Sequence, residues 1–274
     1  YISSILELPH APDESIIIPR EGVLHGEVKE HYIHSALLNQ DRRFWIYTPP
    51  GYCRDNEAYG VLFLLDGGAY VQTMATPLLL DNLLADGKIR PLVTVFVDNP
   101  GETRFPDLLC YKPFIDFLTL ELMPWVHEYY HISPDPAQSL IGGASAGGLT
   151  AAYAAFCAPN IFGNVLSQSG AFWWDWDDEK KTHRNLLMRD FVQSPRKPIR
   201  FYLEVGYLER YPSINLLQIN RHMRDVLEAK GYEVHYAEVG GAHEYISWRV
   251  TLANGLIALA GKQRFENAMD CMIQ

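Results

Sequence analysis

Short apolar runs that alternate with longer helical stretches constrain the fold of this chain most strongly. Residues 60–65 and 92–97 are almost wholly apolar, which is typical of strands buried on both faces of a parallel sheet. Further strands are predicted at 139–141, 201–205 and 233–239. Helical spacing of apolar residues predicts helices between them at 113–130, 149–158, 216–230 and 246–259. This alternation predicts an α/β sandwich around a mostly parallel sheet.

Two other stretches depart from that alternation. Residues 23–48 have the pattern of antiparallel edge strands and end at the turn residues Pro49, Pro50 and Gly51. Residues 172–198 contain three tryptophans and show no clear strand, and we interpret them as a cap inserted over a site. The alternative is a helical surface excursion whose tryptophans pack on the core. With 274 residues, the chain is expected to form a single domain with this insertion.

Composition excludes several classes of protein. The net charge of −10 argues against a nucleic-acid partner, which would require a basic face. No apolar run approaches the roughly 20 residues of a membrane span. The four cysteines form no C-x-x-C pair, so we expect reduced thiols and no metal site, which favours a cytoplasmic location. Because a leader could precede Tyr1, a periplasmic or secreted location stays open, and the sequence does not set the oligomeric state.

The strongest local motif is the G-x-S-x-G sequence of residues 143–147, with Ser145 at its centre. It follows an apolar strand and precedes a helix, which is the context of a nucleophile elbow. Gly143 and Gly147 are expected to remove side chains that would collide with the neighbouring strand and helix. A phosphate-binding loop is excluded because Gly148 occupies the position of the required lysine. The remaining alternative is a glycine turn with an idle serine.

A serine nucleophile needs a base, and His243 is the best candidate. It follows the last predicted strand and a glycine turn, which places it at the carboxyl edge of the sheet, where open α/β sheets bind ligands. His243 and Glu244 resemble the start of the zinc motif H-E-x-x-H, but Ser247 stands where the second histidine must be.

The acid that orients the base is expected on the loop after the preceding strand. Glu209 lies just past that strand and is the first candidate. Glu204, within the strand, the cap residues Asp175 and Asp177, or a Ser–His dyad without an acid are the alternatives.

Two backbone N–H groups are candidates for the oxyanion hole. One belongs to Ala146, which follows the nucleophile, and the other to Gly68, in the glycine turn after residues 60–65. Ala69 is the alternative to Gly68.

Several segments together resemble one family closely. They include the R-F-W-I-Y-T-P-P-G-Y, L-L-D-G-G, S-Q-S-G-A-F-W-W and G-G-A-H-E sequences that begin at residues 43, 64, 167 and 240. With these motifs the chain resembles the enterochelin (ferric siderophore) esterase branch of the esterase D-like α/β hydrolases, over residues 22–260. The resemblance implies an α/β-hydrolase fold of three layers. It also implies hydrolysis of esters in a catecholate siderophore, without a cofactor, the iron being part of the substrate.

The resemblance also implies substrate contacts. Trp173 and Trp174 would line the substrate cleft, and Arg104 would face the catecholate. Tyr207, in the turn before the acid, is a further candidate for substrate binding. The sequence departs from the family after Arg104, and its negative charge would repel an anionic siderophore. A feruloyl, acetyl or general carboxylesterase is the alternative within esterases, and a non-catalytic binding module is the alternative of another class.

Overall fold

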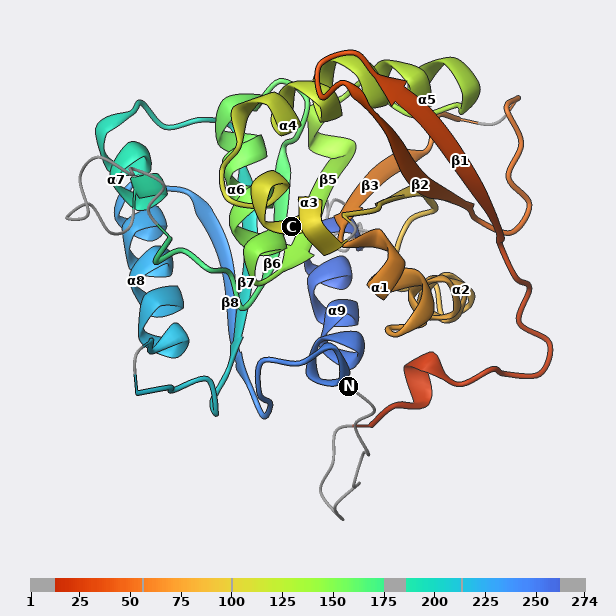
Figure 1. Cartoon of the computed structure of the whole chain (residues 1–274). Helices are drawn as coiled ribbons and strands as arrows, with labels where there is room; N and C mark the ends of the chain where they lie inside the picture. Colours follow the sequence, from red (N-terminus) through yellow and green to blue (C-terminus); the bar gives the residue numbers. More distant parts are fainter. Residues whose placement is uncertain (1–12, 56, 100, 175–185, 213, 262–274) are drawn as a thin grey trace, which may run out of the picture.

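An eight-stranded sheet forms the centre of the computed structural model, which describes residues 13–55, 57–99, 101–174, 186–212 and 214–261 (Figure 1). The strand order is β1-β2-β4-β3-β5-β6-β7-β8. Strands β3 to β8 pair in parallel, whereas β1 pairs with β2 and β2 with β4 in antiparallel fashion. The predicted mostly parallel sheet with antiparallel edge strands is therefore confirmed. The strands are β1 (Glu27–Ser35), β2 (Gln40–Thr48), β3 (Gly60–Leu65), β4 (Leu92–Val97), β5 (Ser139–Ala144), β6 (Asn164–Gln168), β7 (Arg200–Gly206) and β8 (Glu233–Val239).

Helices cover both faces of this sheet, and each face has its own buried apolar cluster. On one face lie α1 (Gly67–Gln72), α2 (Thr76–Ala85) and α9 (Tyr245–Ala260). On the other lie α4 (Lys112–Asp116), a π-helical turn (Phe117–Leu122), α5 (Met123–Tyr129), α6 (Ala146–Cys157), α7 (Leu186–Gln193) and α8 (Leu216–Ala229). Helix α3 (Gly101–Asp107) and two 3₁₀ turns, Ser15–Ile17 and Pro136–Gln138, complete the elements. The three layers agree with the prediction.

Strand β6 was not predicted from the sequence. Only two of its five residues, Val165 and Leu166, are apolar, yet all five are buried. Two of its three polar side chains, Asn164 and Gln168, have internal partners that make their burial possible. Asn164 Nδ2 donates to the carbonyl of Ser139 at 3.0 Å, and Gln168 Nε2 donates to Glu204 Oε1 at 2.7 Å. Local polarity therefore concealed a central strand.

The stretch interpreted as a cap, residues 172–198, is only partly described. Its helical part, α7, packs on the body of the protein, since Phe191 is fully buried against the rings of Phe156, Phe201 and Tyr232. Residues 175–185 lie outside the described part of the chain. A cap over the site therefore stays a prediction, and α7 contributes to the core.

Within the described ranges, no helix is both long and apolar enough to cross a membrane. The three cysteines in those ranges, Cys53, Cys110 and Cys157, are free.

Candidate active site

The turn between β5 and α6 holds Ser145 in an unusual backbone conformation. Its φ of 58° and ψ of −117° are a strained combination for a residue with a side chain. The turn is fixed by hydrogen bonds to the neighbouring segment. Ser145 N–H donates to the carbonyl of Gln168 at 2.8 Å, and Ala171 N–H donates to the carbonyl of Ser145 at 3.0 Å. This backbone conformation is typical of a nucleophile elbow.

The glycines of the motif have unequal roles. A Cβ at Gly143 would lie 2.7 Å from the carbonyl carbon of Gly147, which is too close for real contacts. A Cβ at Gly147 would meet nothing closer than 3.6 Å, which is ordinary contact. The expected collision therefore holds for Gly143 and is wrong for Gly147. A Cβ at Gly148, which the motif does not include, would lie 2.4 Å from Ser167 Oγ.

Three side chains predicted from distant parts of the sequence meet at this turn. His243 Nε2 lies 2.9 Å from Ser145 Oγ, and His243 Nδ1 lies 2.6 Å from Glu209 Oε2. The imidazole comes from the loop between β8 and α9, and the carboxylate from the loop after β7; both loops lie at the lower edge of Figure 1. The His243 side chain is 25% exposed, whereas Glu209 is fully buried. Ser145 and His243 are thus partly exposed, whereas the Glu209 carboxylate that contacts the imidazole is shielded from water.

The two glutamates of this region have different environments. Glu209 accepts a hydrogen bond from Gly206 N–H at 2.8 Å besides its contact with His243. Glu204 is also fully buried, but Tyr202 O–H donates to its Oε2 at 2.8 Å, and Gln168 and Thr251 donate to its Oε1. Burial raises the pKa of Glu204. The structure therefore places Glu209, and not Glu204, beside the imidazole.

The remaining alternative acids, Asp175 and Asp177, lie outside the described residues.

The predicted oxyanion-hole residues begin two helices. Ala146 is the first residue of α6 and Gly68 the second of α1, so neither N–H has an acceptor within its helix. Ala69 N–H donates to the carbonyl of Asp66 at 2.9 Å, which makes it less suitable than Gly68. The two helix starts are neighbours, because a Cβ at Gly147 would lie 3.6 Å from Asp66 Oδ2.

Arg104 forms an ion pair with Asp66, the residue that precedes α1. Its Nε and a terminal nitrogen each donate to a carboxylate oxygen of Asp66 at 2.7 Å. Burial raises the pKa of Asp66, and the guanidinium of Arg104 opposes that rise. Tyr207 lies in the turn after β7 with 48% of its surface exposed. Neither Arg104 nor Tyr207 is among the described residues that line the pocket at Ser145.

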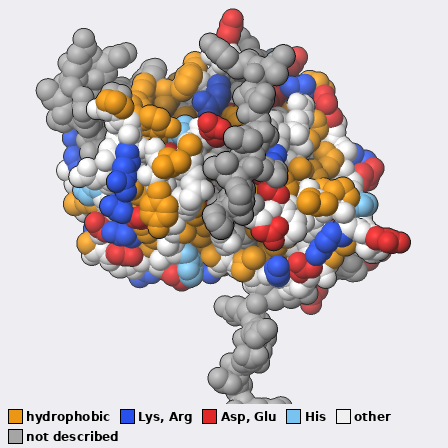
Figure 2. Space-filling model, turned by 90° about the horizontal axis from the view of Figure 1, so that it is seen from below, with side chains coloured by type: hydrophobic (Ala, Val, Ile, Leu, Met, Phe, Trp, Pro, Cys, Tyr) orange, Lys and Arg blue, Asp and Glu red, His pale blue; other side chains and the backbone are white. Residues whose placement is uncertain are grey.

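That pocket has a volume of about 390 Å³ and is mainly apolar. Ser145, Ala146 and His243 form one wall, and Trp173 and Trp174 lie where the resemblance placed them. The sequence reasoning did not name the other lining residues, which apart from Ala171 belong to no motif: Phe105, Leu109, Ala171, Tyr211, Ile214 and Leu216. Figure 2 shows the face that contains the lower edge of Figure 1, where hydrophobic side chains gather beside a column of basic ones.

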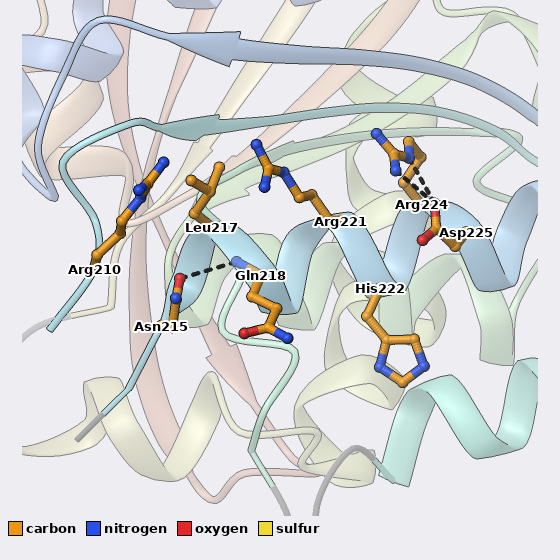
Figure 3. Close-up of a pocket in the computed structure, with 8 residues that line it drawn as sticks. All are labelled: Arg210, Asn215, Leu217, Gln218, Arg221, His222, Arg224 and Asp225. Carbon is orange, nitrogen blue, oxygen red and sulfur yellow. Dashed lines mark hydrogen bonds and ion pairs between the residues drawn. The ribbon is translucent and has the colours of Figure 1, made fainter. Parts of the chain in front are cut away.

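A second pocket of about 440 Å³ lies along α8 and the loop before it. The side chains of Arg210, Arg221 and Arg224 extend to one side of the helix, and His222 points to the other (Figure 3). The segment before α8 borders both pockets, since Tyr211 and Ile214 line the first and Arg210 and Asn215 line the second.

Carboxylates partly neutralise this basic pocket. Arg221 donates to both carboxylate oxygens of Glu238 at 2.6 and 2.7 Å. Arg224 donates to Asp225 Oδ1 at 2.6 Å. Glu228 also interacts electrostatically with Arg224, so three carboxylates lie near the three guanidinium groups of this pocket, in a chain whose net charge is −10.

Among the described residues, no three histidine, cysteine or acidic side chains are grouped so that they could hold a metal ion.

Comparisons with known proteins agree with this geometry. The family model described as "Putative esterase" matches residues 35–259. Iron(III) enterobactin esterase from Dickeya dadantii is 31% identical over 81% of this chain and 52% of its own length. The protein of the same name from Escherichia coli O6:H1 is 31% identical over 93% of this chain and 62% of its length. The chain therefore spans roughly half to three fifths of these relatives.

Solved structures show the same fold. Ferric enterobactin esterase from Salmonella typhimurium superimposes with a TM-score of 0.81 at 28% identity, over 93% of this chain and 63% of that one. A ferulic acid esterase from Anaeromyces mucronatus gives a TM-score of 0.75 at 20% identity, over 93% and 98%. The predicted α/β-hydrolase fold is thereby confirmed. Since the family model covers most of the sequence, the chain belongs to this esterase family.

Proposed function

We propose that this chain hydrolyses carboxylic esters through an acyl-enzyme formed on Ser145. The observation that carries the proposal is the line of contacts from Ser145 Oγ to His243 Nε2 at 2.9 Å and from His243 Nδ1 to Glu209 at 2.6 Å. His243 takes the serine proton as Oγ attacks the ester carbonyl, and Glu209 stabilises the imidazolium that forms. The imidazolium then protonates the leaving alcohol.

The second half of the reaction repeats these roles. A water molecule takes the place of the alcohol. His243 accepts a proton from this water as its oxygen attacks the acyl carbon, and then returns the proton to Ser145 Oγ as the bond between Oγ and the acyl carbon breaks and the carboxylic acid leaves. In both halves the carbonyl oxygen becomes an oxyanion, which the N–H groups of Ala146 and Gly68 stabilise. Removing one such donor typically costs about 3–4 kcal/mol in the transition state.

For the substrate, we propose an ester with a flat aromatic group, and specifically a catecholate siderophore. The indole rings of Trp173 and Trp174 line the pocket beside Ser145, where they can contact the faces of an aromatic ring. A pocket of about 390 Å³ can hold one aromatic ring with its ester rather than a whole tricatecholate. The names of the relatives at 31% identity support the siderophore.

The basic pocket along α8 supports an anionic substrate. With one aromatic arm in the apolar pocket, the rest of a large ferric siderophore would extend past Tyr211 and Ile214 toward Arg210. The guanidinium of Arg210 there would weaken the repulsion from a chain of net charge −10. Arg104 is less suited to this role, because Asp66 already engages its guanidinium.

Replacement of the nucleophile tests the reaction. Ser145→Ala should abolish hydrolysis of a nitrophenyl ester and labelling by a fluorophosphonate, while the circular-dichroism spectrum and melting temperature stay the same. Retained turnover in this variant would disprove the assignment. Absence of both labelling and turnover in the unmodified chain would favour a non-catalytic binding module.

Comparison of substrates tests the finer proposal. The kcat/KM values for iron-loaded siderophore, iron-free siderophore, methyl ferulate and a short nitrophenyl ester are measured for the unmodified chain and for Arg210→Ala. We expect Arg210→Ala to raise KM for the iron-loaded siderophore only. A preference for methyl ferulate, with no effect of Arg210→Ala, would favour the second candidate, a feruloyl esterase. The aromatic lining of the pocket fits that candidate as well.

A further inference from the structure

Ser169 is a buried residue in a costly backbone conformation directly behind the candidate site. It follows β6, is only 1% exposed and has a φ of 52°, in the left-handed region that a non-glycine residue seldom adopts. Its N–H donates to the carbonyl of Glu204 at 2.7 Å, which ties it to β7. A strained position of this kind persists only where the surrounding structure enforces it.

The hydroxyl group of Ser169 has two defined partners. Its Oγ lies 2.5 Å from Glu209 Oε1 and 2.9 Å from Trp248 Nε1. The indole N–H can only donate, so Ser169 Oγ is the acceptor in that bond. A carboxylate can only accept, so the serine proton points to Glu209. The direction of both hydrogen bonds follows from the chemistry of the groups.

These bonds assign separate tasks to the two oxygens of Glu209. Oε1 accepts from Ser169 O–H and from Gly206 N–H, the latter at 2.8 Å. Oε2 is thereby directed to His243 Nδ1 at 2.6 Å. Trp248 also packs edge-on against the His243 ring, with centroids 4.8 Å apart and an interplanar angle of 85°. The indole therefore contacts both the imidazole and the residue that holds the carboxylate.

We propose that Ser169, supported by Trp248, is a positioning residue that holds the Glu209 side chain aimed at His243. The inference rests on the proposed function. Donation to a buried carboxylate favours its charged form, which is the form that fixes the imidazole tautomer. Loss of the donor favours the protonated form of the Glu209–His243 pair, so the pair gains its proton at a higher pH.

Ser169→Ala replaces none of the other ionisable groups near this pair. Glu204 on β7 is the acid whose titration Glu209 influences. The phenol of Tyr202 donates a hydrogen bond to Glu204 directly, and the phenol of Tyr70 is linked to it through Gln168. On the serine side, His243 itself faces Ser145.

The chain offers a closely matched control. Ser167 lies two residues earlier, is equally buried, and its Oγ has no hydrogen-bond partner among the described residues. Ser169→Ala and Ser167→Ala therefore delete the same atom at neighbouring positions. Trp248→Phe keeps an aromatic ring at position 248 but removes the indole donor.

The experiment measures kcat, KM and the pH profile of kcat/KM on a neutral nitrophenyl ester. Ser169→Ala should lower kcat about ten- to a hundredfold with little change in KM, as expected for one lost hydrogen bond to a charged group. The acid limb of its profile should move to higher pH. Trp248→Phe should shift the limb in the same direction by less, and Ser167→Ala should leave both quantities unchanged.

Several outcomes overturn the proposal. One is a Ser169→Ala profile that matches Ser167→Ala, and another is a loss of kcat with an unmoved acid limb, which indicates a structural role only. If Ser169→Ala does not fold, an unshifted limb in Trp248→Phe overturns it. Failure of the proposed function looks different, because the unmodified chain would then hydrolyse no ester.

Discussion

Replacing Glu209 by glutamine should invert the hydrogen bonding of the site. The Oε1 position is held by two donors, Ser169 O–H and Gly206 N–H, so the amide oxygen of the new side chain must lie there. The amide NH₂ then lies at the Oε2 position, 2.6 Å from His243 Nδ1. Since NH₂ only donates, Nδ1 must accept, and the imidazole proton moves to Nε2.

This change of tautomer removes the base. With a proton on Nε2, His243 donates to Ser145 Oγ and can no longer take the serine proton. The same change in a Ser-His-Asp enzyme lowers kcat about ten-thousandfold. That corresponds to about 5–6 kcal/mol of transition-state stabilisation. The side chains have almost the same shape, so we expect little change in KM or in folding.

The assay compares Glu209→Gln with Glu204→Gln. Both glutamates are fully buried, Glu204 within β7 and Glu209 just after it, but only Glu209 contacts the imidazole. We expect kcat on a nitrophenyl ester to fall about ten-thousandfold in Glu209→Gln and less than tenfold in Glu204→Gln. Activity of Glu209→Gln within tenfold of the unmodified chain, with the fold intact, would refute the reasoning from tautomers.

Two further predictions concern stability. Burial raises the pKa of Glu204 above its ordinary value of 4.5, so the folded chain holds that proton to a higher pH than the unfolded chain does, and stability falls as pH rises through this window. The urea midpoint of the unmodified chain should therefore fall relative to Glu204→Gln from about pH 4.5 upward; a relative rise would contradict this. The second prediction compares two glycines of the motif. Gly143→Ala should lower the free energy of unfolding by about 3 kcal/mol, because the new Cβ would lie 2.7 Å from the backbone of Gly147. Gly147→Ala should change this free energy by less than about 1 kcal/mol. Equal urea midpoints for these two variants would count against the steric argument.

Apolar runs were a reliable guide to the sheet because most of its parallel strands are buried on both faces. Strands β3 and β4 coincide with residues 60–65 and 92–97, since burial on both faces leaves little room for polar side chains. Strand β6 has the same burial but three polar residues, of which Asn164 and Gln168 form hydrogen bonds with neighbouring segments. Such partners are distant in sequence, so periodicity could not reveal this strand.

The candidate site, too, could be predicted only in part from the sequence. Ser145, Glu209 and His243 could be predicted because each follows the end of a strand, and the ends of parallel strands meet at one edge. The pocket wall was mostly missed because residues such as Tyr211 and Ile214 belong to irregular segments with no motif. Only tertiary packing brings them to the serine.

The choice between two glutamates shows where local sequence reasoning ends. Glu204 and Glu209 are five residues apart, and alternation along β7 favoured the second as the acid without showing what would hold it there. Its partners come from 40 residues before it, in the turn after β6, and from 34 residues after it, in the loop before α9. A buried carboxylate without such donors would be costly and would tend to take up a proton. The role proposed for Glu209 would therefore depend on Ser169 and Gly206 as much as on its own position after the strand.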